Sequence, residues 1–165
     1  MSSTVRVATA SRAETQRIAA AIASVLVAGD VVVLAGDLGG GKTAFVSGAV
    51  PALGSSAPVS SPTFALVHEY PGPVPIAHLD VYRLHRVQDL HDIGVDELLD
   101  GEHVVFVEWG DLVTAALPTT HLAVRFELGE AADDRVLVIS GLGADWNRRW
   151  SDLLEALTGC GATML

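Results

Sequence analysis

The first strong pattern of hydrophobic positions along the chain is helical. Ser11–Glu14 has the residues of a capping box, and apolar side chains then recur at helical spacing from Ile18 to Leu26. We expect this helix to end at Gly29. The next segment, Val31–Ala35, is an unbroken apolar run rich in β-branched residues. Such a run is typical of a central strand that is buried on both faces.

Later segments alternate between strand and helix patterns. A helix is predicted from Lys42 to about Leu53, despite Gly48 and Pro51, and it is followed by a loop rich in Ser, Pro and Gly over 54–62. Strands are predicted at 64–70, 76–82, 104–108, 122–128 and 135–140, with the first two and the last two paired as hairpins. Two short helices broken at Gly94 are expected within 84–99, and an amphipathic helix over about 145–157.

This layout predicts an α/β protein with a mixed central β-sheet flanked by helices. A chain of 165 residues fits one domain over 1–165, with roughly the first ten and the last eight residues loosely ordered. The 16 glycines and few aromatic residues suit tight loops between strands and helices. The single cysteine, Cys160, excludes a disulfide within the chain.

Gly36–Thr43 reads G-D-L-G-G-G-K-T, which fits the phosphate-binding pattern G-x-x-x-x-G-K-[ST]. It follows a buried-strand pattern and precedes a helix, which is the context that this pattern requires. Glycines let the backbone amides point at phosphate oxygens, and the following helix presents its positive end to the same charge. Lys42, the only lysine of the chain, then reaches the β- and γ-phosphates, and the Thr43 hydroxyl binds Mg²⁺. The predicted nucleotide contacts from this segment are Asp37, Leu38, Gly39, Gly40, Gly41, Lys42, Thr43 and Ala44.

Hydrolysis of a nucleotide also needs an acidic group near the metal ion. Asp80 and Glu108 each end an apolar strand pattern, and ligands bind at the carboxyl ends of strands in open α/β sheets. Either residue alone is also compatible with a solvated acid at a strand end.

Two further features allow a functional and an ordinary interpretation. The hydroxyl groups of the segment 60–63 could sense a γ-phosphate, although a segment of this composition is also compatible with a plain loop. His78, His85 and His91 lie near several aspartates, but their spacing matches no dense metal-ligand motif. We interpret these histidines as surface or hydrogen-bonded residues.

Four motifs occur in a fixed order: the phosphate loop, S-P-T-F at 61–64, H-L-D-V-Y-R-L at 78–84 and V-E-W at 107–109. This ordered set over roughly residues 10–150 resembles the TsaE family, also called YjeE. These are small bacterial ATPases of the pathway that makes threonylcarbamoyladenosine in tRNA.

The resemblance implies a P-loop NTPase fold and a weak ATPase that depends on partners. It implies that ATP and Mg²⁺ are bound, with Asp80 and Glu108 as the acidic pair and Glu108 a ligand of the metal together with Thr43. Ser61 and Thr63 would act as a nucleotide-sensing switch, and Trp109 would lie beside the site. The implied partners are the TsaB and TsaD proteins, and ATP hydrolysis would reset their complex between turnovers.

Charge and hydropathy agree with this interpretation. The formal charge of −10 disfavours direct, strong binding of tRNA, so we expect contact with tRNA only through the partners. The longest apolar run is too short to span a bilayer, and Met1–Ala10 has no apolar segment of signal-peptide length. We therefore expect a cytoplasmic protein that does not contact a membrane.

Three alternatives remain open at this point. A small-molecule kinase would share the loop but would usually add an arginine-rich lid, for which no segment is obvious. A GTP-driven switch is disfavoured because the guanine-reading element needs Asn or Thr followed by Lys, and the only lysine belongs to the phosphate loop. A module that binds nucleotide without hydrolysing it would differ from an ATPase in being insensitive to its partners.

Overall fold

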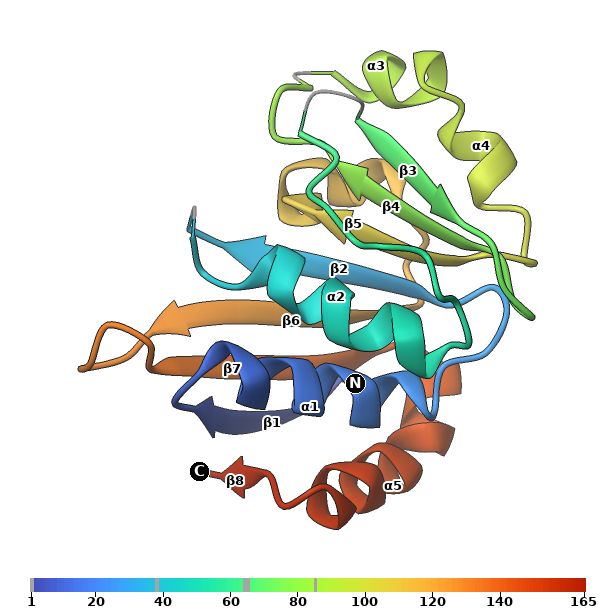
Figure 1. Cartoon of the computed structure of the whole chain (residues 1–165). Helices are drawn as coiled ribbons and strands as arrows, with labels where there is room; N and C mark the ends of the chain where they lie inside the picture. The colour runs from blue at the N-terminus through green and yellow to red at the C-terminus, as the bar shows by residue number, and fades with distance from the viewer. Residues whose placement is uncertain (1, 38, 64–65, 85) are drawn as a thin grey trace.

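The computed structural model describes residues 2–37, 39–63, 66–84 and 86–165, and it is built around one eight-stranded sheet (Figure 1). The sheet order is β3-β4-β5-β2-β6-β7-β1-β8. The strands are β1 (Ser2–Thr9), β2 (Val31–Gly36), β3 (Val67–Tyr70), β4 (Ile76–Asp80), β5 (Val104–Glu108), β6 (His121–Leu128), β7 (Arg135–Leu142) and β8 (Thr163–Met164). The helices are α1 (Arg12–Ala23), α2 (Lys42–Ala52), α3 (Val87–Asp92), α4 (Val95–Leu98) and α5 (Ala144–Gly159), with a 3₁₀ segment η1 (Gly110–Ala116).

The sheet is mixed, as the sequence predicts. Strands β4, β5, β2 and β6 run parallel to one another, and the remaining neighbours are antiparallel. The two predicted hairpins are confirmed as β3–β4 and β6–β7. The carboxyl ends of β2, β4 and β5 meet at one edge of the sheet, because all three are parallel neighbours in register.

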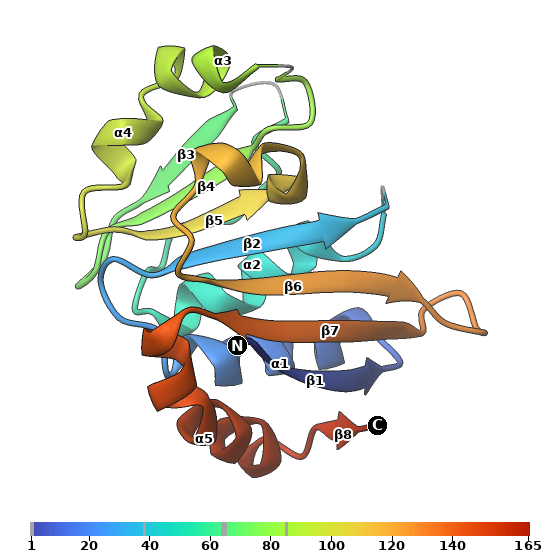
Figure 2. The same cartoon turned by 180° about the vertical axis from the view of Figure 1, so that it is seen from behind.

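Two apolar cores lie on opposite faces of the sheet. Alternate residues of β2 and β5, such as Leu34 and Phe106, pack with α1, α2 and α5. The residues between them, such as Val33 and Val107, pack with α3, α4 and η1. Burial on both faces explains why β2 and β5 read as continuous apolar runs. Figure 1 shows α1 and α2 side by side on one face, and Figure 2 shows the sheet from behind.

The chain ends differ from the prediction. Residues Ser2–Thr9 form β1, which pairs with β7 along its full length, and β8 pairs with β1 near the C-terminus. The loose order expected for both ends is therefore wrong. The segment alternates polar residues with Val5 and Val7, of which Val7 is fully buried. Its hydrogen bonds come from a strand that lies more than a hundred residues away in sequence, so the local pattern was too weak to reveal it.

Helix boundaries also deviate in part. Helix α1 ends at Ala23 with Ser24 as its C-cap, before the expected stop at Gly29. The Ser11 hydroxyl accepts from the Glu14 amide at 3.1 Å, as a capping box requires. The Glu14 carboxylate accepts from the Ala10 amide at 2.6 Å, whereas in a capping box it would accept from the amide of Ser11. The two short helices broken at Gly94 are confirmed as α3 and α4.

Candidate nucleotide-binding site

The glycine loop lies where β2 ends and α2 begins. Gly36 has φ of 136°, and a Cβ added to it would lie 2.8 Å from the carbonyl oxygen of Phe126 on β6. Gly41 is the N-cap of α2 with φ of 111°, which a residue with a side chain rarely adopts. The loop can therefore turn tightly between strand and helix only with glycine at these positions. Leu38, a predicted contact, lies outside the described residues.

Lys42 is the first residue of α2 and its side chain is almost fully buried. Its Nζ donates to the carbonyl oxygens of Gly36 at 2.6 Å and Asp37 at 3.0 Å, and it lies 3.9 Å from the centre of a Trp109 ring. Burial lowers the pKa of this ammonium group below its usual value, although nearby carboxylates, Glu108 foremost, oppose the shift. The only lysine is thus held against the turn that the motif assigns to phosphate.

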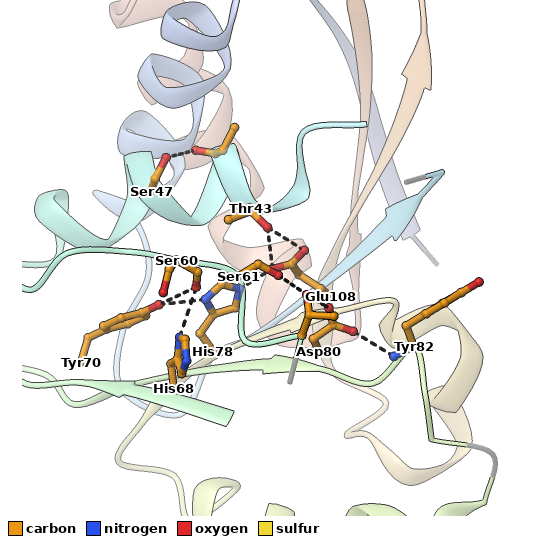
Figure 3. A network of polar contacts seen from close by, with 12 residues as sticks. Thr43, Ser47, Ser60, Ser61, His68, Tyr70, His78, Asp80, Tyr82 and Glu108 are labelled. Carbon is orange, nitrogen blue, oxygen red and sulfur yellow. Dashed lines mark hydrogen bonds and ion pairs between the residues drawn. The ribbon is translucent and has the colours of Figure 1, made fainter. Parts of the chain in front are cut away.

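Thr43 and Glu108 are adjacent although they are 65 residues apart in sequence. The Thr43 hydroxyl lies 3.0 Å from each carboxylate oxygen of Glu108, which is 4% exposed at the end of β5 (Figure 3). A hydroxyl and a carboxylate in contact supply the oxygen ligands that Mg²⁺ takes in phosphate sites, where it binds few protein groups and keeps several waters. This donor set fits the magnesium ion that the sequence predicts.

Asp80 ends β4 in register with Glu108, and it is also buried. One of its carboxylate oxygens accepts from the Tyr82 amide at 3.0 Å. The other accepts from the Thr63 hydroxyl at 3.4 Å, and that hydroxyl lies 2.6 Å from the Ser61 hydroxyl. The predicted acid therefore contacts the predicted switch segment, residues 60–63, which we call the hydroxyl loop.

His78 is hydrogen-bonded, which is one of the two possibilities that the sequence left for it, but it belongs to the site, a role that the sequence interpretation did not give it. It is fully buried on β4, two residues before Asp80, and its Nε2 lies 2.5 Å from a Glu108 carboxylate oxygen. Its Nδ1 lies 3.1 Å from the Tyr70 hydroxyl. The available signal was the alternation of the strand, because residues 78 and 80 must share one face. His91 is the ordinary surface residue expected and pairs with Asp96, whereas His85 lies outside the described residues.

Two arginines also reach the loop, and no sequence motif marks them. Arg135, the first residue of β7, donates from Nε to the Gly40 carbonyl and from Nη2 to the Gly39 carbonyl, both at 3.1 Å. These bonds hold the loop against the β6–β7 hairpin. Arg12 at the start of α1 lines a pocket together with Gly39, Gly40 and Gly41 of the loop. Trp109 has φ of 63° after the end of β5, and its ring lies 4.6 Å from that of Tyr82.

A pocket of about 210 Å³ lies beside the glycine loop. Among the described residues, every predicted contact lines it except Asp37, whose carbonyl oxygen instead accepts from Lys42. The lining residues are Arg12, Gly39, Gly40, Gly41, Lys42, Thr43, Ala44, Ser61, Thr63, Asp80, Glu108 and Trp109. A second hollow of about 140 Å³ shares Arg12 and part of the loop with the first.

Within the described ranges, the structure contains no group of three or more His, Cys, Asp or Glu side chains that could hold a metal ion. Over the same ranges, no helix combines the length and the apolar character needed to cross a membrane.

The strand–loop–helix unit at β2 and α2, placed in a parallel part of a mixed sheet, defines a P-loop NTPase fold, which confirms the predicted class. The family model described as threonylcarbamoyl adenosine biosynthesis protein TsaE matches residues 9–137. The chain belongs to this family, as its motifs predict.

Individual relatives agree with this assignment. The tRNA threonylcarbamoyladenosine biosynthesis protein TsaE of Bacillus subtilis is 37% identical over 146 residues, which cover 88% of each chain. The protein of the same name from Streptomyces coelicolor is 37% identical over 76% of this chain and 88% of its own. A crystal structure of Bacillus subtilis YdiB matches with a TM-score of 0.81 and 31% identity, covering 94% of this chain and 97% of that one.

Proposed function

We propose that this protein binds ATP with Mg²⁺ and hydrolyses it, as a subunit of the machinery that makes threonylcarbamoyladenosine in tRNA. The observation that carries the proposal is the contact between Thr43 and Glu108 beside Lys42 in one pocket. A chance match to the loop motif would give no reason for a buried carboxylate to meet the motif's hydroxyl. Membership of the TsaE family supports the same activity.

Each residue has a role that its position suits. Lys42 would exchange its two carbonyl partners for the β- and γ-phosphate oxygens, and the amides of the loop and of the first turn of α2 would bind the same phosphates. Thr43 and Glu108 would hold Mg²⁺, which when bound neutralises negative charge on the phosphates. The second hollow, which Arg12 and Arg135 line, would take the ribose and base.

Hydrolysis requires that a water molecule attack the γ-phosphorus while the bond to the β-phosphate oxygen breaks, giving ADP and phosphate. Asp80 is the group best placed to orient that water, because its carboxylate faces the pocket and is buried. Ser61 and Thr63 would report the γ-phosphate, Thr63 through its hydrogen bond to Asp80 and Ser61 through its contact with Thr63. Slow turnover by the protein alone is expected where partners complete such a site.

The partner assignment rests on the family and on charge. Relatives of this chain are named as tRNA threonylcarbamoyladenosine biosynthesis proteins, whereas a formal charge of −10 disfavours strong contact with tRNA itself. We therefore infer that TsaB and TsaD bridge the protein to tRNA, and that ATP hydrolysis resets their complex between turnovers. We place the protein in the cytoplasm, because tRNA modification of this kind takes place in that compartment.

The test is the steady-state rate of ATP hydrolysis with and without purified TsaB and TsaD. We expect turnover to increase when both partners are added, and Lys42→Ala to abolish it under both conditions. Arg125→Ala, on the solvent-exposed part of β6, is the matched control and should behave as the native protein. A turnover rate that does not change when the partners are added would refute the proposed assembly with TsaB and TsaD. Rapid phosphate transfer to a nucleoside or sugar would favour a small-molecule kinase.

A further inference from the structure

One polar side chain interrupts the apolar core beside the site. Residues Ile76, His78 and Asp80 point to the same face of β4, and Ile76 belongs to the core that α1 and α2 cover. His78 is fully buried within this face, and both of its ring nitrogens have partners (Figure 3). A buried imidazole with two fixed partners has one orientation, which it imposes on the groups it contacts.

The hydrogen bonds specify where the ring carries its proton. The Glu108 carboxylate only accepts, so Nε2 of His78 is the donor of the 2.5 Å contact. In the neutral imidazole, Nδ1 then accepts, and its partner is the Tyr70 hydroxyl at 3.1 Å. With the Thr43 hydroxyl on the other side of the carboxylate, Glu108 is held between two donors.

Tyr70 extends this contact to the hydroxyl loop. Its hydroxyl also lies 3.3 Å from the carbonyl oxygen of Ser60, so a single proton is shared between that carbonyl and His78. The same carbonyl lies 3.2 Å from Nδ1 of His68, the other residue on this face of β3. The main chain at Ser60 is thereby connected to Glu108 through two buried side chains.

The loop thus contacts both acids of the site by separate routes. Ser60 reaches Glu108 through Tyr70 and His78, whereas Thr63 donates directly to Asp80. A displacement of this short segment would therefore alter the surroundings of both carboxylates together.

We propose that His78 is a positioning residue that orients Glu108 toward the metal ion, and that Tyr70 couples this orientation to the loop at Ser60–Thr63. The inference rests on the proposed function, since it assumes that Glu108 binds a metal ion beside a nucleotide. Partners that orient metal ligands typically account for 10- to 100-fold in metal affinity, so the effect is measurable without turnover.

The experiment measures Mn²⁺ binding to the ADP-loaded protein by electron paramagnetic resonance, because Mn²⁺ takes the same oxygen ligands as Mg²⁺. We expect His78→Leu to weaken Mn²⁺ binding about 10- to 100-fold and to leave ADP affinity without metal unchanged. His78→Gln keeps an N–H donor and should recover most of the affinity. His91→Leu, at a surface histidine, is the matched control.

A second variant tests the connection to the loop. Tyr70→Phe removes only the hydroxyl, and we expect roughly threefold to tenfold weaker Mn²⁺ binding, the loss of about one hydrogen bond. In the His78→Leu background the same change should have no further effect, because Tyr70 acts through His78. If His78→Leu does not fold, the Mn²⁺ affinities of Tyr70→Phe and His78→Gln test the inference instead. Weaker binding by Tyr70→Phe with near-native binding by His78→Gln supports it, and native binding by Tyr70→Phe overturns it.

The outcomes separate the inference from the function on which it rests. Native protein that binds neither ADP nor Mn²⁺ would refute the proposed function. Native binding with unchanged Mn²⁺ affinity in Tyr70→Phe and His78→Leu would overturn this inference alone. Variants that lose ADP affinity without metal to the same extent as Mn²⁺ affinity would also overturn it, because His78 and Tyr70 would then only support the fold.

Discussion

Gly48 lies in the middle of α2, where it lets this helix approach α1 closely. A Cβ built on Gly48 would lie 2.3 Å from the carbonyl oxygen of Gln16 and 2.5 Å from its Cα. Both atoms belong to the backbone of α1, so no side-chain rotation can relieve the overlap. Gly48→Ala therefore forces α1 and α2 apart by roughly 1 Å, since a carbon–carbon or carbon–oxygen contact needs more than 3 Å.

The expected cost follows from two opposing effects. Overpacking of a buried contact costs about 1–3 kcal/mol, whereas alanine is favoured over glycine in a helix by about 0.8–1 kcal/mol. The difference between the two is a net loss of at most about 2 kcal/mol, which corresponds to a Tm lower by at most roughly 4–8 °C in a domain of this size. Because α2 also carries Lys42 and Thr43, the same displacement should weaken nucleotide binding.

Thermal unfolding followed by circular dichroism measures this change. Gly159→Ala is the matched control, because Gly159 ends α5 and an added Cβ there meets no atom within 4 Å. We expect the control to be as stable as the native protein or slightly more stable. If Gly48→Ala raised the Tm as the control does, the close packing of α1 on α2 would be refuted.

Three further predictions concern charged groups. Lys42→Ala should weaken ATP binding at least tenfold in calorimetry, because it removes the ammonium group that contacts the phosphates and the chain has no other lysine. Glu108→Ala should reduce ATP hydrolysis about 10²- to 10³-fold and change nucleotide affinity much less. The control Glu127→Ala, on the same sheet, should leave both unchanged. Equal hydrolysis by the native protein and Glu108→Ala would show that Glu108 takes no part in the site. The hydrogen bond from His103 holds the pKa of Asp100 at about 2, so Asp100 stabilises the fold above pH 4, and this contribution is lost as the pH falls toward 2. Asp100→Asn should remove that pH dependence from denaturant unfolding and lower the pKa of His103 in an NMR titration, and an unchanged imidazole pKa would contradict the pairing.

The sequence revealed those parts of the site that local patterns specify. Continuous β-branched runs identified β2 and β5 because both faces of these strands are buried, and the glycine motif located the turn after β2. Asp80 and Glu108 followed from the rule that ligands bind at the carboxyl ends of parallel strands. The structure brings them together because β4 and β5 are neighbours in register.

Contacts between distant segments could not be predicted in the same way. Strand β1 has few apolar residues and depends on β7 for its hydrogen bonds. Arg135 reaches the phosphate loop only because the β6–β7 hairpin lies beside it, and nothing in its sequence neighbourhood indicates this. His78 looks like one of several histidines near aspartates until the register of β3, β4 and β5 places it between Tyr70 and Glu108.

The measurement that tests the central claim most directly is isothermal titration of the purified protein with a non-hydrolysable ATP analogue and Mg²⁺. Binding by the loop at Gly36–Thr43 predicts a saturable heat of association in the native protein that Lys42→Ala greatly weakens and Arg125→Ala preserves. Absence of any heat in the folded native protein, with the analogue raised into the millimolar range, would contradict nucleotide binding at this site.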